Sequence, residues 1–211
     1  MSPPQPRQAA NTERPRGLHF AVALANAAHP AVEWAGLASA HGDTELGARR
    51  VDSADLARAV AEIRAVFAIT DNTLAATALN LLMASSDSPG AMVGTAEGPR
   101  GTELTQLENG RWALRPRIAA AETAAAVYRA VTAFALAEWL AERGRCAWGV
   151  CAAETCTNVF VDEGRRAPQR FCSTPCATRT RVAAHRRASN TANGEARRHA
   201  KAASPEAGPA A

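Results

Sequence analysis

Four cysteines in the C-terminal third of the chain constrain its fold more than any other feature of the sequence. They form two close pairs, Cys151/Cys156 and Cys172/Cys176, with a 15-residue insert between the pairs. At such short spacings both thiolates of each pair can reach one tetrahedral metal ion, and four thiolates are a preferred ligand set for Zn²⁺. A zinc ion held by four thiolates keeps no open position for a catalytic water. The spacing therefore predicts one structural zinc.

Because the chain has a fifth cysteine, the identity of one zinc ligand stays undecided. Cys146 stands before Cys151 at the same Cys-x4-Cys spacing that separates Cys151 from Cys156, so spacing alone allows Cys146 to replace Cys156. A disulfide framework is the weaker interpretation, because the cysteine count is odd and four of the five have zinc spacing. A reduced cytoplasm also suits free metal-binding thiolates.

The residues around the cysteine pairs predict a small zinc-stabilised fold of the treble-clef kind. A short β-prone run stands at Val159, Phe160 and Val161. Turn-forming residues follow it, and after Pro175 comes a basic segment without Gly or Pro. We expect a zinc knuckle, a short hairpin, a second knuckle and a basic helix, with the second cysteine pair at the start of that helix.

Charge is divided unevenly along the chain. Residues 164–201 contain ten Arg or Lys and one acid, Glu195, whereas the rest of the chain contains 14 basic and 19 acidic residues. The segment therefore carries about +9 and the remainder about −5. This polarity is typical of a nucleic-acid-facing module attached to an acidic body. The alternative is a solvated basic tail without a partner.

The basic segment supplies the candidate nucleic-acid contacts. Successive residues of a helix advance by about 100°, so Arg179 and Arg186 share one face while Arg181 and His185 share another. Arginines in the insert between the cysteine pairs would add a second line of contacts. We expect Arg179, Arg181 and Arg186 to contribute most. The full candidate set is Arg165, Arg166, Arg170, Arg179, Arg181, His185, Arg186 and Arg187.

The region before the cysteines predicts a mainly helical domain, residues 18–143, with a small β-hairpin, so the fold class is mainly α (α+β). Residues 1–17 are rich in proline and predict a disordered tail. The segment from Leu18 to Asn26 alternates apolar and small residues, a strand-like period that a helix tolerates equally. Residues 29–50 predict a connection with about one helical turn around Trp34.

Two amphipathic helices and a hairpin follow. The first helix is capped by Asp52 or Ser53 and has an apolar face at the 3.6-residue period, formed by Leu56, Val60, Ile63 and Phe67. The second helix, residues 73–84, is expected to bury Leu74, Ala78, Leu81 and Leu82. After a loop at residues 85–101, strands 103–107 and 111–115 are joined by an Asn-Gly turn, and residues 118–143 predict one long helix.

The cysteine-rich stretch resembles the CGNR-type zinc finger, the C-terminal module of a bacterial family of proposed transcription regulators. The likeness rests on the first Cys-x4-Cys, the Phe-Val-Asp run at 160–162, the arginine-rich insert and the Phe-Cys-Ser entry at 171–173. The motif that names the family reads Cys-Ala-Thr-Arg here, at 176–179, so Ala and Thr replace Gly and Asn. Alanine is as good as glycine in the first turn of a helix, and metal binding should survive the change.

The resemblance implies a two-domain transcription regulator. Residues 146–188 would be the DNA-binding finger, residues 18–143 a regulatory domain like the family's ABATE domain, and residues 189–211 a flexible basic tail. Because Cys156 leads into the Phe-Val-Asp run, the resemblance favours Cys156 over Cys146 as a ligand. It also favours DNA over RNA, for which the expected aromatic stacking residues are few.

Other functions have less support. No glycine-rich phosphate loop, Gly-x-Ser-x-Gly or His-Glu-x-x-His occurs, so we expect no enzyme. No apolar run approaches the roughly 18 residues of a membrane span, and we expect a cytoplasmic protein. The alternative function is a zinc-stabilised module that binds RNA or an acidic protein partner. A homo-oligomer would suit paired DNA half-sites, although no residue identifies an interface.

Overall fold

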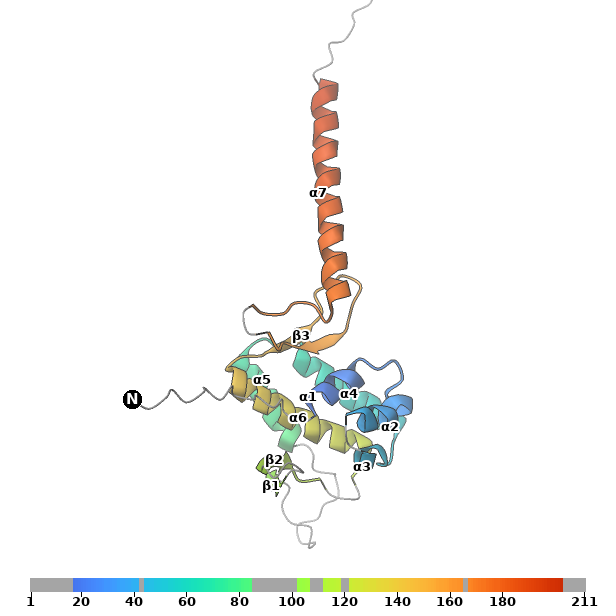
Figure 1. The fold of residues 1–211 in the computed structure, drawn as a ribbon, viewed down its shortest axis with the longest axis vertical. Coiled ribbons are helices and arrows are strands. Elements are labelled where there is room, and N and C mark those ends of the chain that lie inside the picture. Colours follow the sequence, from blue (N-terminus) through green and yellow to red (C-terminus); the bar gives the residue numbers. More distant parts are fainter. Residues whose placement is uncertain are drawn as a thin grey trace, which may run out of the picture.

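The computed structural model describes residues 17–41, 44–84, 102–106, 112–118, 122–164 and 167–202. Figure 1 shows a helical body from which one long helix projects, with a small hairpin between them. The described elements are α1 Leu18–Ala25, α2 Pro30–Ala40, α3 Thr44–Gly47, α4 Ser53–Phe67, α5 Asn72–Ala84, β1 Thr102–Gln106, β2 Trp112–Pro116, α6 Ala124–Arg143, β3 Trp148–Val150, β4 Val159–Val161 and α7 Thr174–Ala202. The mainly helical class with a small antiparallel hairpin and a C-terminal cysteine cluster is confirmed.

Helix α6 is the central helix of the body and packs against α1, α4 and α5. The Thr123 hydroxyl accepts a hydrogen bond from the Ala126 N–H at 3.3 Å and caps its start, and Gly144 ends it in the left-handed conformation at φ 64°. Its length and mean hydropathy of 1.2 would also fit a membrane span, but 56% of that apolar window is buried inside the body. The other helices of the body therefore account for its apolar character.

Helix α1 lies close against α6. Gly17, just before α1, has φ 91°, and a Cβ at this position would lie 2.5 Å from Val131 Cγ1 on α6. Phe20 meets Trp34 and Tyr128 edge-to-face at ring-centroid distances of 5.4 and 6.0 Å. The segment with the alternating pattern is therefore a helix. Its small residues Ala21 and Ala25 are buried together with the large apolar residues.

The prediction of a connection over residues 29–50 is wrong, because α2 and α3 occupy most of it. Pro30 opens α2, and the His29 N–H donates to Glu33 Oε1 at 2.8 Å. Trp34 is 1% exposed and donates from Nε1 to the Leu46 carbonyl at 3.1 Å, which ties α2 to α3. The glycines of this segment argued against a helix. A glycine within a helix, such as Gly36 in α2, lowers its stability by about 1 kcal/mol, and the burial of Trp34 outweighs this loss.

Helix α4 forms as predicted, with the Asp52 side chain accepting a hydrogen bond from the Asp55 N–H at 2.8 Å. The apolar face predicted for α5 is right at Ala78 and Leu82, which pack partly buried against the core, and wrong at Leu74 and Leu81. Leu74 and Leu81 are 63% and 62% exposed, whereas Ala75 and Leu79 are buried. Helix α5 packs on α6 and α4, and a small residue such as alanine at a helix contact lets two backbones approach closely.

The first hairpin pairs β1 with β2 in antiparallel register, Leu104 opposite Leu114, and Pro116 ends β2 as predicted. Helix α6 begins at Ala124, six residues later than predicted. The predicted Asn109-Gly110 turn, the loop at 85–101 and almost all of the predicted N-terminal tail lie outside the described residues.

The second hairpin, β3–β4, joins the cysteine-rich segment to the body. Ala147, Trp148, Val159 and Val161 belong to the same buried cluster as the helices. Trp148 Nε1 donates to the Val66 carbonyl of α4 at 3.2 Å. Asn26 Nδ2 donates to the Val159 carbonyl at 2.9 Å, and Asn26 Oδ1 accepts from the Val159 N–H at 2.8 Å. The body and the cysteine-rich segment therefore share one hydrophobic core.

Two further side chains cross the same boundary. Arg64 on α4 donates to the carbonyl of Ala25 at 2.6 Å and to that of Thr157 at 2.5 Å. Asn72, at the start of α5, donates from Nδ2 to the Gly144 carbonyl at 3.2 Å and accepts from the Cys146 N–H at 2.9 Å. These contacts hold the cysteine-rich segment to the helices at Gly144 and Cys146, before β3, and at Thr157, before β4.

We expect Asn26→Ala to destabilise the zinc-loaded protein by about 1–3 kcal/mol, because the substitution leaves the backbone N–H and C=O of Val159 without partners. Urea denaturation measures the change. Asn80→Ala is the matched control, since Asn80 is exposed on α5, and it should change the free energy of unfolding by less than about 0.5 kcal/mol. Equal effects of the two substitutions would contradict this prediction.

Candidate metal centre

Four cysteine side chains meet between the second hairpin and α7. The Sγ atoms of Cys151, Cys156, Cys172 and Cys176 all lie within 4.8 Å of one another. The Sγ atoms of Cys156 and Cys172 are 3.7 Å apart, as are those of Cys172 and Cys176. A tetrahedral zinc ion with Zn–S bonds of about 2.3 Å separates its sulfurs by about 3.8 Å. The four thiolates therefore fit one structural zinc, as predicted.

The first pair is positioned by the end of the β3–β4 hairpin. The Cys151 N–H donates to the Asn158 carbonyl at 2.8 Å, which continues the pairing of the two strands. The chain then turns back, and the Cys156 N–H donates to the Ala153 carbonyl at 2.9 Å. This turn is the predicted first knuckle.

The second pair is positioned by the start of α7. Cys176 lies in the first turn of the helix, where its N–H donates to Ser173 Oγ at 3.4 Å. The Cys172 N–H points to the sulfur of Cys151 at 3.4 Å and joins the two pairs. The N-terminal turn of a helix carries free N–H groups and a partial positive charge, both of which favour a thiolate.

Little else holds α7 to the protein. The cluster around the metal site is small, with Cys151, Ala153 and Cys176 buried and Cys156, Phe171 and Cys172 packed around them. Figure 1 shows α7 beginning at the loops beside β3 and projecting away from the helical body. Because so few apolar groups meet here, zinc is needed to fix the start of α7, which is the role of a structural ion.

The environment shifts the pKa values of two of the thiols, Cys172 and Cys176, in opposite directions. The Ser173 hydroxyl, followed by the Arg179 guanidinium, lowers the pKa of Cys176 to about 6. Arg179 Nη2 lies 3.2 Å from the Cys176 sulfur. Burial raises the pKa of Cys172. Of these two thiols, Cys176 is therefore the one that ionises more readily.

The structure adds an ion pair with a buried carboxylate, beside the β3–β4 hairpin, that the sequence had not singled out. Asp162 is 2% exposed, and Arg145 Nη2 lies 2.7 Å from its Oδ2. Burial by itself raises the pKa of this carboxyl, but the bond from Arg145 and backbone bonds from Gln169 and Gly164 outweigh burial, so the pKa is lowered. The sequence feature that could have pointed to this pair is an acidic residue, Asp162, directly after the apolar run of β4. The pair joins the chain just before β3 to the residue just after β4, and the backbone bond from Gly164 to Asp162 fixes the start of the loop that follows.

Cys146 does not join the metal site. Within the described residues the cluster contains Cys156 instead. The side chain of Cys146 packs partly buried against the helical core, where burial raises its pKa. The ligand set that the resemblance implied is the one that the structure brings together.

The predicted nucleic-acid contacts separate into several groups. Arg165 and Arg166 lie outside the described residues. Arg170 is exposed, with its guanidinium 5.9 Å from the Phe171 ring centroid. Arg187 lies 3.7 Å from the carboxylate of Glu154. The remaining candidates are Arg179 beside the metal site and the exposed side chains of Arg181, His185 and Arg186.

The predicted flexible tail at residues 189–211 differs from the structure, in which α7 continues to Ala202. Alanine is frequent in this segment, and neither Pro nor Gly interrupts it apart from Gly194. The helix therefore extends well beyond the metal site, because helix propensity outweighs the mixed composition. Residues 203–211 lie outside the described part of the chain.

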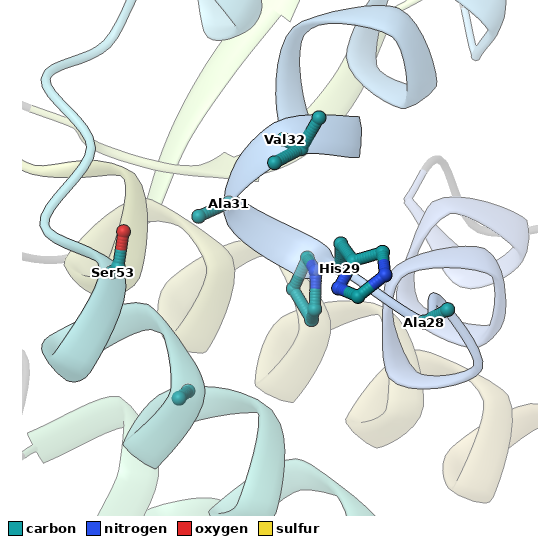
Figure 2. Close-up of a pocket in the computed structure, with 7 residues that line it drawn as sticks. Ala28, His29, Ala31, Val32 and Ser53 are labelled. Atoms are coloured by element: carbon teal, nitrogen blue, oxygen red, sulfur yellow. The ribbon is translucent and has the colours of Figure 1, made fainter.

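A shallow hollow lies on the body between α2 and α4 (Figure 2). Its volume is about 240 Å³, which is below the roughly 300–1,000 Å³ of typical small-molecule sites. The residues around it are Ala28, His29, Pro30, Ala31, Val32, Ser53 and Ala57. Alanine, proline and valine dominate this lining, and we assign no ligand to it.

We expect Cys176→Ser to reduce the bound zinc below one ion per chain, because the substitution removes a thiolate whose partners lie within bonding distance of the same ion. Metal analysis after gel filtration measures the zinc content. Cys146→Ser is the matched control and should keep one zinc per chain. Loss of zinc in the Cys146 variant would contradict the ligand set.

Comparison with known proteins places the metal centre in a familiar kind of segment. Residues 148–188 match the family model described as the CGNR zinc finger. The search of curated proteins gives no match. The matched residues include both cysteine pairs, the β3–β4 hairpin and the first half of α7, whereas the helical body lies outside them. The metal centre therefore lies in a zinc-binding segment similar to the CGNR zinc finger.

Proposed function

We propose that this protein binds duplex DNA through its zinc finger and α7, and thereby regulates transcription in the cytoplasm. The main support for the proposal is a basic helix that the metal site anchors at one end and that projects clear of the body (Figure 1). The helical body would sense a signal or assemble copies of the chain.

The shape of α7 supports binding in a groove. The helix contains 29 residues, so at 1.5 Å per residue it is about 43 Å long. From Arg181 to Asn190 every side chain except Ala183 is exposed. The major groove of B-DNA admits an α-helix, and a helix that projects from the body can enter the groove without a clash from the body.

Charge supports a polyanionic partner. Around the helix axis Arg181 and His185 lie roughly opposite Cys176, on the side that faces away from the metal. Within the described residues no hydrogen bond or ion pair holds Arg181 or Arg186. A helix that is polar on all sides and carries mostly like charges gains little stability alone, and phosphates would relieve the repulsion between the arginines.

The metal site supports a binding protein over an enzyme. Four thiolates occupy all positions of a tetrahedral zinc ion, so the ion offers no site for a substrate or a catalytic water. The body has helices, a small hairpin and a closing helix α6, a layout that supports an ABATE-like regulatory domain.

Titration of the zinc-loaded protein onto random-sequence and genomic duplex fragments, over a range of salt concentrations, tests the proposal. We expect binding that weakens steeply with salt and enrichment of particular genomic fragments. Failure to retain duplex DNA at physiological salt would overturn it. Retention of single-stranded RNA or of an acidic protein in its place would identify the alternative function.

We expect Arg181→Ala/Arg186→Ala to weaken DNA binding and to reduce the slope of log K against log salt by about 0.9 for each phosphate that the variant no longer neutralises. Fluorescence anisotropy at several salt concentrations measures the slope. The matched control is Arg50→Ala/Arg58→Ala, which removes two exposed arginines from the body. An unchanged slope in the α7 variant, or an equal reduction in the control, would exclude a role of Arg181 and Arg186 in phosphate binding.

A further inference from the structure

Arg179 is an exposed residue of α7 whose guanidinium turns back toward the metal site. Its Nη2 donates to the Cys176 sulfur at 3.2 Å, one helical turn back along the chain. Cys176 is 4% exposed, so this sulfur is covered by protein and not by water. Among the described residues, Arg179 is the one cationic side chain within hydrogen-bonding distance of a ligand sulfur.

The chemistry of the centre explains why a cation belongs there. A Zn²⁺ ion with four thiolates carries a formal charge of about −2. An N–H···S bond withdraws charge from the sulfur and holds its direction, and such supporting groups tune the affinity of metal sites. Arginine is suited to this role because its guanidinium stays charged and presents rigidly placed donors.

The other hydrogen bonds to the ligand sulfurs come from neutral groups. The Cys151 sulfur receives the Cys172 N–H at 3.4 Å, and Ser173 Oγ lies 3.8 Å from the Cys172 sulfur. Arg179 therefore supplies the direct cationic contact to this anionic cluster.

We propose that Arg179 is a positioning residue of the zinc centre, which donates to Cys176 Sγ and keeps that thiolate on the metal. Its main contribution is then metal retention and not contact with phosphates, so it differs from Arg181 two residues later. This inference goes beyond the proposed DNA binding and rests on the metal centre alone. Under this proposal, metal retention takes the place of the leading nucleic-acid contact that the sequence predicts for Arg179.

The test compares Arg179→Ala with Arg181→Ala in the full-length protein. Competition against a chromophoric chelator measures the zinc affinity of each variant. We expect the Arg179 variant to bind zinc about 10–100-fold more weakly than the parent protein, and the Arg181 variant to bind zinc as the parent does. Arg179→Gln, which keeps a neutral N–H donor on a shorter side chain, should fall between Arg179→Ala and the parent.

A spectroscopic signal separates this role from a general loss of helix stability. With Co²⁺ in place of zinc, the thiolate-to-metal charge-transfer bands report on the sulfurs directly. We expect these bands to shift in Arg179→Ala and to stay unchanged in Arg181→Ala. Parent-like zinc affinity and parent-like Co²⁺ bands in Arg179→Ala would overturn the proposal.

DNA binding at saturating zinc provides the third measurement. We expect the salt slope to fall by about 0.9 in Arg181→Ala and to remain unchanged in Arg179→Ala. A lower slope in Arg179→Ala with unchanged zinc affinity would make Arg179 a phosphate contact and overturn the inference. If the parent protein does not bind DNA, the proposed function fails, while the zinc and Co²⁺ measurements still decide the role of Arg179.

Discussion

Burial of the β3–β4 hairpin against the helical core is the contact that organises both halves of the molecule. Trp148, Val159 and Val161 lie in the same buried cluster as α1, α4 and α6, while the far end of the hairpin carries Cys151 into the metal site. The hairpin has only three residues in each strand, and a short two-stranded ribbon is not stable in water by itself. The body therefore stabilises the hairpin, and the hairpin orients the metal.

Polar side chains fix where the hairpin lies on that core. Asn26 forms two hydrogen bonds with the backbone of Val159 and so occupies the position of a neighbouring strand. Arg64 bonds carbonyls on both sides of the boundary. Apolar contacts alone are not directional, whereas backbone hydrogen bonds have a defined geometry. A change in the packing of α1 or α4 would therefore reach the finger through a short, direct route.

Zinc performs the corresponding task at the other end of the finger. The start of α7 meets few apolar groups, and Cys176 in its first turn supplies the bond to the metal. Arg179 in the same helix donates a hydrogen bond to Cys176, whereas within the described residues no hydrogen bond or ion pair holds Arg181 or Arg186. The arginines of this one basic helix therefore have different surroundings, which their distance from the sulfur cluster distinguishes.

Local spacing in the sequence was enough to predict the features that depend on neighbouring residues. Cysteine spacing identified the zinc ligands apart from the choice between Cys146 and Cys156, and the cap at Asp52 with an apolar period identified α4. The buried side of α5, with Ala75 and Leu79 inside and Leu74 outside, emerged from the packing of the helices. Tertiary contacts likewise join the hairpin to the helical core, whereas the hydrogen bond from Arg179 to Cys176 is a local contact within α7. The physical reason is that periodicity reports an apolar or charged face, whereas the partner of that face is set by contacts between residues far apart in sequence.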